Sequence, residues 1–78
     1  MGKRRVFGEF EPTEKKQLEE ELLIRYPIDQ YPEDIEIEGH ASGSVTVTKG
    51  GKAVNGFPVD YDFADKVNTA LKLLANLA

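Results

Sequence analysis

The sequence predicts a small α/β (α+β) domain built as a two-layer sandwich, with a mixed four-stranded sheet open to water on one side and both helices on the other. Three observations lead to this prediction. Short segments alternate apolar and polar residues, as half-buried strands do. Two longer segments repeat apolar residues at helical spacing. Gly50-Gly51 separates two of the strand-like segments, where it favours a two-residue hairpin turn. The expected order of elements is β-α-β-β-β-α.

The first strand is expected over residues 4–10, because aromatic and β-branched side chains recur there with a period of two. Val6, Gly8 and Phe10 share one face. With that face toward the helices, Phe7 points to the open face and leaves an aromatic ring among charges. This placement has two interpretations: a contact point for a partner, or a register that is displaced by one residue.

The first helix is expected to begin at Pro12, whose missing N–H does no harm in a first turn. Glu11 and Glu14 lie near the positive end of its dipole. Pro27 stops the helix near Arg25. The apolar stripe of this helix consists of Leu18, Leu22, Leu23 and Tyr26. The connector that follows has two expected inward anchors, Ile28 and Tyr31.

The remaining strands follow from alternation and glycines. Residues 34–38 place two isoleucines on a buried face and acidic side chains on the other. Residues 44–48 place valines inward and threonine hydroxyls outward. Beyond the glycine turn, residues 52–54 should pair back antiparallel, and Asn55-Gly56 and Pro58 end that strand.

The last helix is expected to begin near Asp60 or Asp62, either of which suits an N-cap. Its apolar residues at helical spacing are Phe63, Val67, Ala70, Leu71, Leu74 and Leu77. Both helices should cover the same face, because the outward threonines and glutamates of the sheet are too polar to lie beneath a helix. The first β-α-β unit should be a right-handed crossover between parallel strands.

Composition restricts the function classes. The length of 78 residues suits one domain, residues 1–78, with residues 1–3 as a short basic arm. The chain has no cysteine, which excludes disulfides, a thiolate nucleophile, zinc knuckles and iron–sulfur clusters. No apolar run approaches the ~20 residues that span a bilayer, so we expect no membrane partner and a cytoplasmic location. No cofactor is expected.

Several segments carry a family resemblance: Leu18-Glu19-Glu20-Glu21-Leu22 running to Tyr26-Pro27, the acidic second strand, the Gly-Ser-rich loop before Val45-Thr46-Val47, the Gly51-Lys52-Ala53-Val54 hairpin and the closing helix. In this order they resemble the small thioredoxin-like domains of the selenoprotein W type, the Rdx family. The resemblance covers residues 4–77 and implies a thioredoxin-like fold. That family places Cys-x-x-Cys, or its selenocysteine variant, just after the first strand, where residues 7–12 hold no thiol. Thiol–disulfide exchange needs a thiolate, so the resemblance implies the fold without the activity.

The open sheet face is the first candidate binding surface. Its expected residues are Arg5, Phe7, Glu36, Thr46 and Thr48. The acidic side of the second strand either docks a basic partner or imitates nucleic-acid phosphate. It also has two ordinary interpretations, a solvated face or the protection of an edge strand from other chains. Arg5 is expected beside Glu36 or Glu9, where it can pair across strands.

The loop that contains Gly39, His40, Ser42 and Gly43 is the second candidate. Glycines allow close backbone approach, hydroxyls donate to anions, and histidine titrates near neutrality. The loop lacks the P-loop pattern, and a flexible solvated connection is the alternative interpretation. A Ser-His-Asp triad built on Ser42 or Ser44 has no nucleophile elbow to support it, and one histidine specifies no metal site. No catalytic or metal-binding residue is assigned.

The leading hypothesis is a non-catalytic interaction or accessory domain that binds a protein through its open sheet face or an edge strand. The second is association with nucleic acid through the basic arm Lys3-Arg4-Arg5, assisted by Lys49 and Lys52 at the hairpin tip, which the net charge of −4 disfavours. The third is a thiol-less relative of selenoprotein W-like redox proteins that has kept thiol-enzyme partners. A homodimer is compatible with all three.

Overall fold

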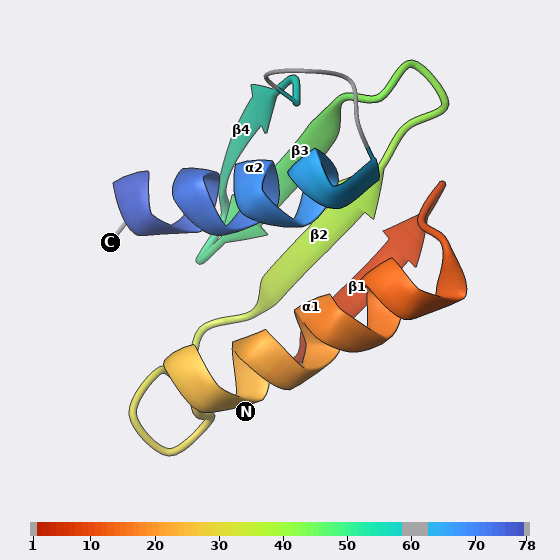
Figure 1. Cartoon of the computed structure of the whole chain (residues 1–78). Helices are drawn as coiled ribbons and strands as arrows, with labels where there is room; N and C mark the ends of the chain where they lie inside the picture. Colours follow the sequence, from red (N-terminus) through yellow and green to blue (C-terminus); the bar gives the residue numbers. More distant parts are fainter. Residues whose placement is uncertain (1, 59–62, 78) are drawn as a thin grey trace.

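The chain folds into the expected succession of elements, β-α-β-β-β-α (Figure 1). The computed structural model describes residues 2–58 and 63–77. Within them the elements are β1 (Arg4–Gly8), α1 (Pro12–Arg25), β2 (Ile35–Gly39), β3 (Val45–Lys49), β4 (Lys52–Gly56) and α2 (Phe63–Asn76). The structure is therefore a small α+β domain, as the sequence predicted.

The strands form one mixed sheet in the order β1-β2-β3-β4. β1 and β2 are parallel and are joined through α1, whereas β2, β3 and β4 are antiparallel neighbours. The mixed four-stranded sheet is thus confirmed. β2 pairs on both sides, so the interpretation that its acidic residues protect an edge strand is wrong. The edges of the sheet are β1 and β4.

Both helices lie on the same side of the sheet and contact each other, as Figure 1 shows. Alternate residues of β2 and β3 are fully buried toward the helices, and the residues between them are half-buried on the opposite face. The buried apolar core consists of Val6, Leu18, Leu22, Ile35, Ile37, Val45, Val47, Val67, Ala70 and Leu74. No described element covers the opposite face, which confirms the two-layer prediction.

Helix α1 has the predicted bounds because a proline stands at each end. The carboxylate of Glu14 accepts a hydrogen bond from the N–H of Glu11 at 3.1 Å, which satisfies one free amide of the first turn. Leu22 is fully buried, but Leu23, expected in the same stripe, is 59% exposed. Consecutive helical residues point about 100° apart, so the narrow stripe that meets the sheet takes only one of the two leucines.

The connector between α1 and β2 is held differently from the expectation. Ile28 and Tyr31, the expected inward anchors, are both exposed. The guanidinium of Arg4 holds the connector instead, because it donates to the carbonyl oxygens of Tyr26 and Glu33, each at 2.7 Å, and to that of Tyr31. A planar fork with several donors suits such a role.

β1 ends at Gly8, two residues before the predicted end, and the prediction of a strand to Phe10 is wrong. Gly8 has φ +90°, and a Cβ there would lie 2.3 Å from the carbonyl oxygen of its register partner Gly39. A Cβ on Gly39 would lie 2.8 Å from the ring of Phe10. The two glycines therefore let the chain turn at Gly8, and Phe10 packs on the core from outside the strand.

The β3–β4 hairpin turns at Gly50 and Gly51, whose φ angles of +57° and +84° match the predicted turn. β4 continues to Gly56, so the strand extends two residues beyond the predicted residues 52–54, includes the Asn-Gly pair and ends before Pro58. Asn55 pairs with Thr46 in register, and Leu73 of α2 packs closely against Gly56. Contact with α2 thus keeps the Asn-Gly pair extended.

Helix α2 buries Val67, Ala70 and Leu74, with Leu71 and Leu77 packed partly buried beside them, as the spacing predicted. The expected caps Asp60 and Asp62 lie outside the described residues. Among the helices that the structure describes, none is long and apolar enough to cross a membrane.

Candidate functional site

The open face of the sheet carries two rows of side chains that run across all the strands. One row consists of Arg5, Glu36, Thr48 and Ala53, and the next consists of Phe7, Glu38, Thr46 and Asn55. Side chains alternate along a strand, so all of these lie on the face away from the helices. We call these two rows the open-face cluster. It contains every residue that the sequence predicted for this face.

Phe7 lies on the open face because its neighbour Val6 is buried in the core, so the alternative of a displaced register is wrong. The guanidinium carbon of Arg5 lies 4.4 Å from the centre of the Phe7 ring. Phe7 is half-buried and Arg5 is exposed. A cation stacked on an aromatic ring is attracted by about 0.5–1 kcal/mol at an exposed site. The pair forms a flat, amphipathic patch at the edge strand β1.

The acidic residues Glu36 and Glu38 lie in the middle of the same face, on the interior strand β2. Arg5 is beside Glu36 in the parallel register, as expected. The expected ion pair between them is not formed, and the guanidinium of Arg5 lies over the Phe7 ring instead. The two carboxylates are half-buried, and neither forms an ion pair with a described cation.

A chain of hydrogen bonds crosses the neighbouring strands. His40 Nε2 lies 2.7 Å from the hydroxyl of Thr46, and that hydroxyl donates to Asn55 Oδ1 at 2.5 Å. Because Thr46 gives its only proton to Asn55, His40 must donate from Nε2. The chain holds the imidazole against the sheet. The hydroxyls of Ser42 and Ser44 bond each other at 3.0 Å, and among the described side chains His40 bonds Thr46 rather than a serine.

The loop that was predicted as a second candidate site uses backbone amides for hydrogen bonds within its own turn. Gly39 is the last residue of β2 and is buried. The N–H of His40 donates to the carbonyl of Ser44, and the N–H of Gly43 donates to the carbonyl of His40, both at 3.0 Å. These bonds close a tight link between β2 and β3, with Gly43 at φ +91°. Ser42 is exposed on the outside of this link. Two of the amides that an anion would need therefore already have partners.

The basic residues at the start of the chain are divided among separate contacts. The backbone N–H of Lys3 donates to Asp34 Oδ1 at 2.8 Å. The guanidinium of Arg4 is bound to carbonyl oxygens of the connector, and that of Arg5 is stacked on Phe7. The three cations thus do not form a continuous basic stripe, which is the feature that phosphate binding requires.

Three members of the open-face cluster, Glu38, Ala53 and Asn55, were not predicted as site residues. Glu38 was recognised only as part of the acidic side of its strand, Ala53 only as part of a strand, and Asn55 only as the end of that strand, although the alternation of the strands would have placed all three in the cluster. In the described part of the chain, no group of three or more Asp, Glu or His side chains is placed to hold a metal ion. The arrangement offers recognition through charge, an aromatic surface and hydrogen bonds.

Comparisons with known proteins give no relative from which a role could be transferred. No protein-family model, curated protein or solved structure matches the chain. The open face is therefore the feature from which a function is inferred.

Proposed function

We propose that this domain is a non-catalytic binding module that takes a protein partner on the open-face cluster. The observation that carries the proposal is the meeting of two features on one uncovered face. One is the stack of Arg5 on Phe7, and the other is the pair of carboxylates at Glu36 and Glu38, neither of which forms an ion pair with a described cation. Aromatic and arginine side chains dominate the energy of protein interfaces, and unpaired carboxylates select the charge of the partner.

The partner that fits best presents a basic, extended segment. Glu36 and Glu38 are two residues apart on one strand, which separates their side chains by about 7 Å. Lysine or arginine side chains two residues apart on an extended partner have the same spacing. Phe7 and the hydrogen-bonding chain of Thr46 and Asn55 lie in the same row as Glu38, where they would contact the apolar stems and backbone of such a segment.

Two other modes of protein binding have less support. A homodimer formed through this face would bring the glutamates of two copies together, and like charges at an interface are costly. Strand addition at an edge would use β1 or β4, each five residues long, and β4 begins with Lys52. Short edges and lysines are features that discourage strand addition.

The remaining hypotheses stay predictions. Nucleic-acid association has lost its simplest support, since Arg4 and Arg5 are each engaged with other groups of the domain. The resemblance to selenoprotein W-like, thioredoxin-like domains is supported by the order of elements alone, and without cysteine it brings no redox activity to this chain. A cytoplasmic location likewise remains a prediction.

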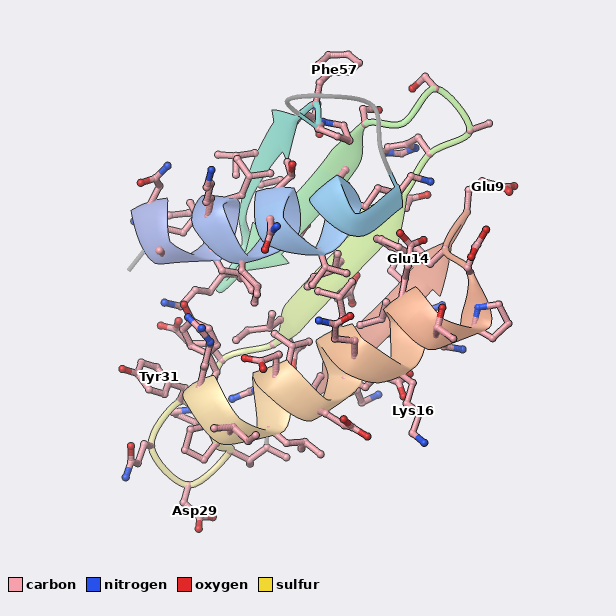
Figure 2. All side chains as sticks on the ribbon, in the orientation of Figure 1. Glu9, Glu14, Lys16, Asp29, Tyr31 and Phe57 are labelled. Carbon is pink, nitrogen blue, oxygen red and sulfur yellow. The ribbon has the colours of Figure 1, made fainter. Side chains whose placement is uncertain are left out.

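Site-specific photo-crosslinking tests the proposal. A benzophenone amino acid is placed at Thr48, in the open-face cluster, or at Lys16, on the outer side of α1 (Figure 2). We expect crosslinks to a specific protein from position 48 and none to that protein from position 16. Equal labelling from both positions would contradict the proposal, as would turnover of a small molecule with no partner at all.

Binding of the identified partner then separates the face from the rest of the surface. We expect Phe7→Ala or Glu36→Lys to weaken binding by about tenfold or more, the effect of losing one central interface contact. Ile24→Ala serves as the matched control, because Ile24 is a 75% exposed apolar residue on α1. Equal affinities of Phe7→Ala, Ile24→Ala and the unchanged domain would refute the assignment of this face.

A further inference from the structure

A hollow of about 310 Å³ lies at the end of the molecule opposite the β2–β3 link, away from the open-face cluster. The connector, the tip of the β3–β4 hairpin and the residue that follows α2 form its walls. Its lining includes Gln30, Tyr31, Glu33, Lys49, Lys52 and Leu77. Its volume is at the lower end of the range of about 300–1,000 Å³ that is typical of small-molecule sites.

Lys49 is the unusual residue of this hollow. It occupies the last core-facing position of β3, after Val45 and Val47, and it is only 7% exposed. Its ammonium lies 5.1 Å from the centre of the Tyr26 ring and 5.4 Å from that of Tyr31. The two rings meet edge to face, 5.3 Å apart. A buried lysine is thus held against two aromatic rings at the wall of a hollow.

The ammonium of Lys49 lacks a negative partner. Within the part of the chain that the structure describes, its nitrogen makes no ion pair and no hydrogen bond. Aromatic rings attract a cation, but they do not replace the hydrogen-bond acceptors of water that the rings displace from its N–H groups. A largely buried lysine of this kind is stabilised by an anion that enters the hollow.

The charges around Lys49 also favour the binding of an anion in the hollow. Lys52 is directly opposite Lys49 in the hairpin register, and like charges opposite each other destabilise a ladder. Among the described residues that line the hollow, Glu33 is the only carboxylate, and it packs against Gly50, 3.1 Å from the position of an added Cβ. It forms no ion pair with either lysine. The described part of the lining therefore carries two cations and one anion.

We propose that this hollow binds a small ligand in which an oxyanion, carboxylate or phosphate, is attached to an apolar body. Lys49 and Lys52 would bind the oxyanion, and the amide of Gln30 would add a hydrogen bond. The exposed ring of Tyr31, labelled in Figure 2, and the side chain of Leu77 would contact the apolar body. The site is independent of the open-face cluster, so either proposal can fail without the other.

Titrations followed by amide NMR shifts test the proposal with four probes: benzoate, phenyl phosphate, inorganic phosphate and benzylamine. We expect benzoate, phenyl phosphate or both to shift the amides of Gln30, Gly50, Gly51 and Lys52, with an affinity on the order of 1 mM for ligands of this size. A preference between the two aromatic anions identifies the oxyanion. Inorganic phosphate, which lacks the apolar body, should bind more weakly. Benzylamine, a cation with the same ring, should not bind. Equal binding of benzylamine, or no shift with either aromatic anion, would overturn the proposal.

Variants locate the binding. Lys49→Gln should weaken binding of the preferred anion by about tenfold, the effect of losing one charge-assisted hydrogen bond. Lys52→Gln should weaken it less, and because Lys52 is exposed this variant tests the site even where Lys49→Gln disturbs the fold. Lys16→Gln removes the same charge from the outer side of α1 and is the matched control (Figure 2). Equal affinities of Lys52→Gln and Lys16→Gln, with Lys49→Gln no weaker, would refute the site.

Discussion

The close approach of Gly8 and Gly39 predicts a large effect of one methyl group. An alanine at position 8 meets two separate costs. The positive φ of +90° disfavours any L side chain, by about 1–2 kcal/mol. The added Cβ would also lie 2.3 Å from the carbonyl oxygen of Gly39, which is backbone and cannot rotate away. Moving that carbonyl breaks its hydrogen bond with the N–H of Glu9, worth about 1 kcal/mol. We expect Gly8→Ala to lower the free energy of unfolding by about 3 kcal/mol.

Gly51→Ala is the matched control, because Gly51 has nearly the same φ, +84°, but no atom within 4 Å of an added Cβ. It should lose only the conformational part, about 1–2 kcal/mol. Urea unfolding followed by circular dichroism measures both variants. In thermal unfolding, each kcal/mol should lower the Tm by about 4–8 °C in a domain of this size. If Gly51→Ala proves as destabilising as Gly8→Ala, the steric contact between β1 and β2 is not what holds this corner.

Three further predictions concern the first helix and the connector, and urea unfolding measures each of them. Leu22→Ala should lower the free energy of unfolding by about 2–5 kcal/mol, because Leu22 is fully buried. Leu23→Ala should lower it by less than about 1 kcal/mol, because Leu23 is 59% exposed. Equal losses would contradict the placement of the apolar stripe of α1. Arg4→Lys should lower the free energy of unfolding by about 1–2 kcal/mol and speed amide hydrogen exchange in the connector, because an ammonium cannot reach all the carbonyl oxygens that the guanidinium binds. Unchanged exchange would show that other contacts hold the connector. Glu21→Gln removes the ion pair with Arg25 and should change the free energy of unfolding by less than about 0.5 kcal/mol, because both side chains are substantially exposed. A larger loss would mean that this pair stabilises α1 more than surface ion pairs usually do.

Most of the helices and strands could be predicted from the sequence, because the chemistry of neighbouring residues determines them. The prolines at the two ends of α1 set its bounds, because each restricts the backbone whatever surrounds it. Gly50-Gly51 determined the hairpin for a similar reason, since positive φ angles are cheap only for glycine. The alternation of Val45, Val47 and the threonines between them determined which side of β3 faces the helices. From this alternation, the sequence also predicted the open face and five of the residues in the open-face cluster.

Tertiary structure alone decided the features that depend on partners distant in the chain. The position of β2 inside the sheet changed the meaning of its glutamates from edge protection to a central acidic pair, and no local pattern specifies strand order. Contact with α2 kept Asn55-Gly56 in β4, although Asn-Gly favours a turn when it stands alone. Lys49 is buried against Tyr26 and Tyr31, which lie in another segment, so its surroundings follow from packing. Backbone restrictions act within a few residues and can be read locally, whereas burial and charge pairing are properties of the assembled layers.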